Sequence, residues 1–144
     1  RNLNRAFSIR LATWSKDQRA LRSVRLSVFV EEQKVDAREE FDDADPVCQH
    51  ILAIDASGKA IGTGRIDDKG KIGRLAVLPE WRKLGVGRAI LQKAVDLARE
   101  DNLKRVYLHA QVSAMGFYER EGFTSYGECF IEAGIKHVAM ERNF

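Results

Sequence analysis

Two glycines and three cations gather at one junction of the chain, in the segment LAVLPEWRKLGVGRAIL, residues 75–91. An apolar run is interrupted by a proline, and apolar residues resume at helical spacing after Gly85 and Gly87. The first amides of a helix have no intrahelical acceptor, and the helix dipole adds positive charge at the same end. Glycines keep side chains away from those amides. The cations are Arg82, Lys83 and Arg88. The pattern favours a cradle for a phosphate-bearing small molecule.

Three other interpretations of this junction compete with the cradle. A dinucleotide fold fits poorly, because GVGRAI has Ile90 at the third glycine position and the next strand ends at Gln111 without a ribose-binding acid. A Walker loop is absent. A plain strand-to-helix turn with solvated charges stays open on these residues alone.

The remaining candidate side chains each have a structural interpretation beside a chemical one. Tyr118 lies at helical spacing from Ala114, which suits a core aromatic as well as a proton donor. His137 and Glu32 suit either a pocket or a structural role, and His109 shares a strand face with Gln111. Three histidines and two cysteines show no ligand spacing, so no metal site is predicted.

The N-terminal half must supply strands and helices that position the junction. Residues 7–14 alternate apolar and polar, as in a half-buried strand. SKDQ predicts a capping box with Ser15 at the N-cap, and apolar spacing predicts a helix to about Gln33. The acidic segment AREEFDDADP predicts a short helix or loop, more often solvated than a patch for a cationic substrate.

The rest of the chain predicts an antiparallel meander and then a helix leading to a parallel strand. Residues 48–55, 59–66 and 71–78 form the three meander strands, joined by turn residues. A helix follows from Val86 with a left-handed stop at Asn102, then a buried strand at 105–110 and a helix at 113–122 closed by Gly122. Two short strands complete an α+β order that is not doubly wound.

Bulk composition excludes several classes of protein. The 144 residues, 44% of them hydrophobic with only 2 prolines, predict a single domain over 1–144. No apolar run reaches membrane-span length and no signal-like segment opens the chain, which begins at Arg1 rather than Met. Cys48 and Cys129, without C-x-x-C spacing, predict two buried reduced thiols and a cytoplasmic protein. A net charge of +3 with scattered basic residues does not indicate nucleic-acid binding.

Several separated motifs together resemble one family. R-x-x-G-x-G follows IGRLAV, and LHAQVSAMGFYEREGF comes downstream. This pair closely resembles the GNAT superfamily of acetyl-CoA-dependent N-acetyltransferases. VFVEEQKV, CQHILA and FIEAGIKHVAM resemble its ElaA/YjcF-like branch. The resemblance implies the GNAT fold: a mixed, mostly antiparallel sheet of about six to seven strands flanked by helices, splayed between two central parallel strands.

The resemblance also implies roles for particular residues. Backbone groups of Leu75, Ala76 and Val77 bind the pantetheine arm of acetyl-CoA, and Gln111 places a side chain on that arm. Tyr118 matches the tyrosine beside the thioester sulfur. Arg82 stands where many members have glutamine. The amides that hold the pyrophosphate belong to Lys83, Leu84, Gly85, Val86, Gly87 and Arg88, and Arg82 adds positive charge beside them.

The implied reaction is direct transfer of acetyl from acetyl-CoA, as cosubstrate, to the primary amine of a small molecule. The general base stays open: the central strand has Gly73 and Arg74 where some members carry glutamate, which leaves water leading to Glu32 or His137, or an amine that arrives neutral. Arg74 suits an acidic part of the acceptor. Rival functions are a coenzyme A-binding sensor without catalysis and a protein or peptide N-acetyltransferase. Relatives often form homodimers, and the sequence leaves the oligomeric state open.

Overall fold

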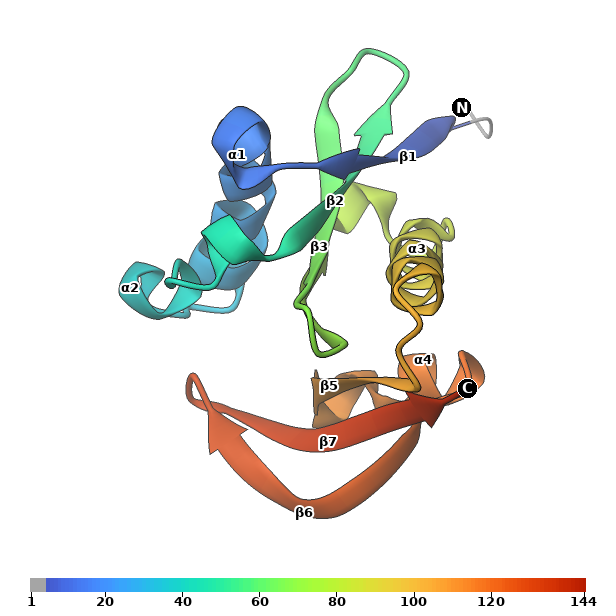
Figure 1. The fold of residues 1–144 in the computed structure, drawn as a ribbon. Helices are drawn as coiled ribbons and strands as arrows, with labels where there is room; N and C mark the ends of the chain where they lie inside the picture. Colours follow the sequence, from blue (N-terminus) through green and yellow to red (C-terminus); the bar gives the residue numbers. More distant parts are fainter. Residues whose placement is uncertain (1–4) are drawn as a thin grey trace.

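The computed structural model describes residues 5–144, which form a seven-stranded mixed sheet flanked by helices (Figure 1). The strands run in the order β1-β2-β3-β4-β5-β7-β6. They are β1 (Phe7–Ala12), β2 (Gln49–Asp55), β3 (Ala60–Ile66), β4 (Lys71–Val77), β5 (Arg105–Gln111), β6 (Thr124–Glu132) and β7 (Ile135–Asn143). The helices are α1 (Trp14–Arg25), α2 (Ala37–Glu40), α3 (Val86–Glu100) and α4 (Met115–Arg120). The other helical segments are the π-helix η1 (Leu26–Glu32) and three 3-10 turns, η2 (Asp45–Val47), η3 (Pro79–Trp81) and η4 (Val112–Ala114).

The first helix begins two residues earlier than the capping-box motif predicts. Thr13 is the N-cap: its backbone is extended, and its hydroxyl accepts a hydrogen bond from the Lys16 amide at 3.3 Å. Asp17 closes the cap by accepting from the Thr13 amide at 3.0 Å. The prediction of Ser15 as N-cap is therefore wrong, because Thr13 and Asp17 satisfy the free amides of the first turn. β1 accordingly ends at Ala12 rather than at residue 14.

The helical segment does run to Glu32, but its last two turns are π-helical. The Gln33 amide donates to Val28 O at 3.0 Å, which is the wide i to i−5 spacing. Lys34 then takes a positive φ of 63° and ends the segment. The wider turn carries Phe29 and Gln33 to the surface that faces β4 and β5.

The meander and the parallel pair have the predicted topology. β2, β3 and β4 pair antiparallel, whereas β4 and β5 run parallel. The parallel pairing covers only Lys71 with Tyr107 and Ile72 with Leu108. Beyond Ile72 the two strands form no further pairs, and the β3–β4 ladder has an irregularity near Arg74, which has a φ of 53°. The α+β GNAT fold predicted from the sequence is confirmed.

Helix α3 packs against one face of the meander, while α1 and α2 cover the other (Figure 1). The buried residues of α3 include Val86, Ile90, Ala94 and Leu97, the face predicted from spacing. The helix lies close to β3 because Gly62 has no side chain: a Cβ there would meet the Ile90 side chain at 2.8 Å. Asn102, with φ 60°, ends the helix in the left-handed conformation that was predicted.

Three details differ from prediction, and two of them lie wholly in the C-terminal part. α4 is short, with the 3-10 turn η4 before it and Gly122, φ 91°, after it. β6 and β7 each span nine residues rather than being short. The prediction of two buried thiols is also wrong, because Cys129 is exposed on the edge strand β6 and Cys48 is only partly covered.

Candidate active site

A cavity of about 880 Å³ opens where β4 and β5 separate. Both strands line it, together with the start of α3, helix α4, the end of η1, the α2 segment and the β6–β7 turn. Because β4 has no neighbour on this side beyond Ile72, part of its backbone faces the cavity without a strand partner. Leu75, Ala76 and Val77 all line it. The site is therefore built around an interrupted sheet.

The predicted anion cradle lies at one end of this cavity. Gly85 is the N-cap of α3 with φ 89°, a left-handed conformation that favours glycine. The first hydrogen bond of the helix runs from the Ala89 amide to Gly85 O at 3.0 Å, so the amides before Ala89 have no intrahelical acceptor. The cavity-lining residues of this loop are Arg82, Lys83, Gly85, Val86, Gly87 and Arg88. Leu84 belongs to the same loop, but its side chain is 44% exposed and outside the cavity lining.

Hydrogen bonds within the protein hold the Arg82 side chain in place. Its Nε donates to Val77 O at 2.9 Å, and its terminal nitrogens donate to the two Glu32 oxygens at 2.8 and 2.6 Å. The pair ties the end of η1 to the end of β4. The hydrogen bonds from Arg82 lower the pKa of Glu32, and Glu32 does not line the cavity. The structure thus places Glu32 as the partner of Arg82 at the rim.

Tyr118 projects into the cavity from α4. Its ring lies 5.0 Å from that of Phe117 and 6.0 Å from that of Phe123, both edge to face. Burial raises the pKa of Tyr118 to about 12. Within residues 5–144 its hydroxyl has no hydrogen-bond partner, so the proton is free to be donated to a ligand.

The opposite end of the cavity is lined by β5, β7 and the turn between β6 and β7. Gln111 donates to Gln33 Oε1 at 2.9 Å, which joins β5 to the end of η1. His137 pairs with Gln111 in the β5–β7 register, and its Nδ1 lies 2.7 Å from Ile135 O. His109 also lines the cavity, with its Nδ1 2.9 Å from Glu132 Oε1.

An ionic cluster that the sequence pattern does not predict contributes to one wall of the cavity. Its members are Arg25, Glu40, Asp42, Asp45, Arg65 and Arg74. Arg25 is 1% exposed and Glu40 4%, with Nε and Oε2 2.9 Å apart. Arg74 Nε lies 2.9 Å from the same Glu40 oxygen. The cluster pins the α2 segment to β3 and β4.

Two expectations change because of this ionic cluster. The acidic segment is only partly solvated, because Glu40, Asp42 and Asp45 pair with arginines while its other two carboxylates are exposed. Arg74 is occupied by Glu40 and Asp42, so it does not offer a free charge to an acceptor. Hydrogen bonding to Arg65 lowers the pKa of Asp42 to about 2. The six charges balance, and the signal that pointed to them was the density of acids in residues 37–46.

The structure brings most of the predicted site residues into one cavity. Those that line it are Leu75, Ala76, Val77, Arg82, Lys83, Gly85, Val86, Gly87, Arg88, Gln111, Tyr118 and His137. His50 lies elsewhere: it is buried under Trp14 with Nε2 2.7 Å from Asp45 O, and burial lowers its pKa.

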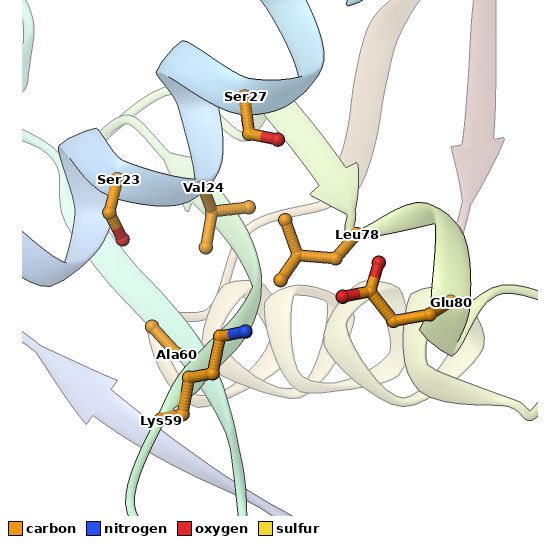
Figure 2. A pocket seen from close by; sticks show the side chains of 7 residues that line it. All are labelled: Ser23, Val24, Ser27, Lys59, Ala60, Leu78 and Glu80. Carbon is orange, nitrogen blue, oxygen red and sulfur yellow. The ribbon is translucent and has the colours of Figure 1, made fainter.

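A smaller cavity of about 280 Å³ lies between α1 and the start of β3 (Figure 2). Figure 2 shows Lys59 and Glu80 beside it, with the apolar side chains of Val24 and Leu78. It contains none of the predicted site residues. The larger cavity is therefore the candidate active site.

Residues 5–144 contain neither a candidate membrane-spanning helix nor a candidate group of metal ligands. No helix there is both long and apolar enough to cross a membrane. No group of three or more His, Cys, Asp or Glu side chains is placed to hold a metal ion in the same part of the chain.

Comparison with known proteins identifies this arrangement. Residues 17–144 match the family model described as Acetyltransferase (GNAT) domain. The chain belongs to the GNAT acetyltransferase family. The sequence is 36% identical over 124 residues to YjcF of Bacillus subtilis (strain 168), described as an uncharacterized N-acetyltransferase, covering 83% of this chain and 88% of YjcF. The crystal structure of Escherichia coli ElaA matches with a TM-score of 0.83 and 26% identity, covering 94% and 99% of the two chains. The predicted resemblance to the ElaA/YjcF-like branch is thus confirmed.

A third match is a protein whose structure was solved with coenzyme A. N-acetylglutamate synthase from Neisseria gonorrhoeae, in a complex with coenzyme A and N-acetyl-glutamate, matches with a TM-score of 0.71 and 21% identity. The match covers 96% of this chain and 35% of that protein, and it concerns the fold alone. Membership of the family supports acetyl transfer as the general activity of this GNAT domain.

Proposed function

We propose that residues 1–144 form a single N-acetyltransferase domain that moves acetyl from acetyl-CoA to a primary amine of a small molecule by direct transfer. The observation that carries the proposal is one continuous cavity. Its lining includes the α3 cradle, Tyr118, the part of β4 that has no strand partner on this side, and the polar side chains of His109, Gln111 and His137.

The cradle suits the cosubstrate by charge and shape. The free amides at the start of α3 and the cations Lys83 and Arg88 favour a diphosphate. The pantetheine arm then adds to the open edge of β4 in the manner of an extra strand. Arg82 is already bound to Val77 O and Glu32, so it shapes the rim and contributes charge from a fixed position.

The chemistry needs a proton donor at sulfur. The amine lone pair attacks the thioester carbonyl, a C–N bond forms, the C–S bond breaks, and the leaving thiolate takes a proton. Tyr118, protonated at all physiological pH values, supplies that proton. Unpaired amides of β4 stabilise the carbonyl oxygen as negative charge develops on it.

The acceptor end supports a small molecule over an extended peptide. The α2 segment, the end of η1 and the β6–β7 turn all border it, and the cavity volume of about 880 Å³ lies in the range of small-molecule sites. Polar groups there include His109, Gln111 and His137. A compact polar amine matches this lining.

The experiment is a thiol-release screen with acetyl-CoA against small primary amines and peptides, with mass spectrometry of each product. The proposal predicts N-acetylation of one or more small amines. Coenzyme A binding without consumption of acetyl-CoA in any reaction would favour the sensor function, and preferential turnover of peptides would favour a peptide acetyltransferase.

A further inference from the structure

His109 lies immediately beyond the point where the central strands separate. Leu108 and Ile72 form the last β4–β5 pair, so His109 and Gly73 are the next residues across the opening. A Cβ on Gly73 would meet nothing within 4 Å, so there is open space beside Gly73. Both residues line the candidate active site. An acceptor amine has room to approach the thioester here.

The contact with Glu132 fixes which imidazole nitrogen is available. Nδ1 of His109 lies 2.9 Å from Glu132 Oε1, and an ionised carboxylate only accepts hydrogen bonds. Nδ1 therefore carries the proton, which leaves the Nε2 lone pair free in the neutral ring. The ring of Phe130 packs edge to face at 5.0 Å and holds the imidazole in place. This is the arrangement of a general base with an orienting carboxylate.

The other candidate bases are less suited to the task. Glu32 is bound to Arg82 outside the cavity, and the buried Glu40 carboxylate is held by two arginines. His137 has a free Nε2, but its Nδ1 faces a backbone carbonyl and the side chain is 7% exposed. A carbonyl stabilises a newly formed imidazolium less than a carboxylate does.

We propose that His109 is the general base for the acceptor amine and that Glu132 is its positioning residue. The inference rests on the acetyltransferase function proposed above. The ammonium gives one proton to Nε2 of His109, which passes it to solvent. After C–N bond formation the nitrogen loses a second proton, which replaces the one that Tyr118 has given to sulfur. One proton is released for each acetyl group transferred.

The kinetic test uses His109→Asn on the amine that the screen identifies. Asparagine keeps an N–H near the position of Nδ1 for Glu132 and deletes Nε2. At pH 7 we expect kcat/KM for the amine to fall about a hundredfold or more, with affinity for coenzyme A unchanged. The deficit should narrow as the pH rises, because an amine that is already neutral needs no base. An equal loss at every pH, or no loss, would overturn the proposal.

The Glu132 test separates positioning from packing. In Glu132→Gln, kcat/KM for the amine should fall, by less than in His109→Asn, because an amide both donates and accepts and no longer fixes the proton on Nδ1. Glu128→Gln, on the same strand and outside the cavity, is the charge-matched control and should leave kcat/KM unchanged. The other charged or titratable side chains of β4, β5 and β7 that line the cavity are His137, Lys71 and Arg74, all unchanged in both variants.

A second readout needs no acceptor at all. Nitrogen-15 spectra of the histidine rings should show the Nδ1–H tautomer for His109 in the wild-type protein and a mixture in Glu132→Gln. An Nε2–H tautomer in the wild type, or no change in the variant, would contradict the assignment. Absence of any acetylated amine in the screen would instead refute the proposed function, while the spectra still decide whether the pair exists.

Discussion

Replacing Tyr118 by phenylalanine removes one hydroxyl and keeps the ring in its contacts with Phe117 and Phe123. Loss of a positioned general acid lowers rates by about 10²- to 10⁴-fold. At about 1.36 kcal/mol per tenfold, that is a barrier increase of roughly 2.7 to 5.5 kcal/mol. We expect kcat for the best amine to fall within this range, with KM for acetyl-CoA nearly unchanged, in a continuous thiol-release assay.

Stability provides the control for Tyr118→Phe. Within residues 5–144 the hydroxyl has no hydrogen-bond partner, so the melting temperature near neutral pH should change little. At alkaline pH the variant should be more stable than the wild type. Burial raises the pKa of Tyr118 from 10 to about 12, so above pH 10 the unfolded wild type releases a proton that the folded protein keeps. The wild type should lose at most about 2.7 kcal/mol relative to the variant between pH 10 and 12.

The outcomes of the Tyr118→Phe experiment are distinct. Full turnover by the variant would remove Tyr118 from the mechanism. A lower kcat accompanied by a large loss of stability near pH 7 would show that the hydroxyl acts in packing and not in proton transfer.

Three further predictions follow from neighbouring contacts. Gly87→Val should weaken coenzyme A binding by calorimetry while the fold is retained, since a Cβ there meets Phe117 and Val77 at ordinary distances of 3.6 and 3.7 Å; unchanged affinity would refute the cradle. His137→Ala should change KM or kcat for the amine and leave coenzyme A affinity within about threefold, because the His137 side chain lines the cavity; kinetics equal to wild type would exclude His137 from the acceptor site. Asp42→Asn should destabilise the protein near pH 7 and progressively less as the pH falls from about 4 to about 2, the range over which the lowered pKa of Asp42 acts, as measured by urea unfolding; an equal difference at all pH values would show no ionic contribution.

The parts of the fold that the sequence predicts are those governed by local periodicity. The meander strands, the apolar face of α3 and the left-handed Asn102 all follow from spacing within a short window. The N-cap was misplaced because Ser15 and Thr13 both lie near the helix start, and only Asp17 accepting from the Thr13 amide decides between them. The lengths of β6 and β7 depend on the pairing of β7 with β5 and of β6 with β7, which no local pattern records.

The candidate site shows the same division between local and distant contacts. The glycine and cation spacing of the α3 cradle is local, and the structure places it on the cavity. The partners of Glu32 and Arg74 are distant in sequence: Arg82 lies fifty residues from Glu32, and Glu40 lies on another element from Arg74. Pairings of this kind arise from the tertiary fold, so the acidic segment looked solvated and Glu132 was not connected with His109.

The most direct test of the central claim follows an isotopically labelled acetyl group from acetyl-CoA, in parallel reactions with small primary amines and with peptides. Mass spectrometry identifies the product and the atom that carries the label. The account predicts an N-acetylated small amine, formed faster than any acetylated peptide and at least about a hundredfold more slowly by Tyr118→Phe. Label found only on peptides, or acetyl-CoA that is bound and never consumed, would contradict it.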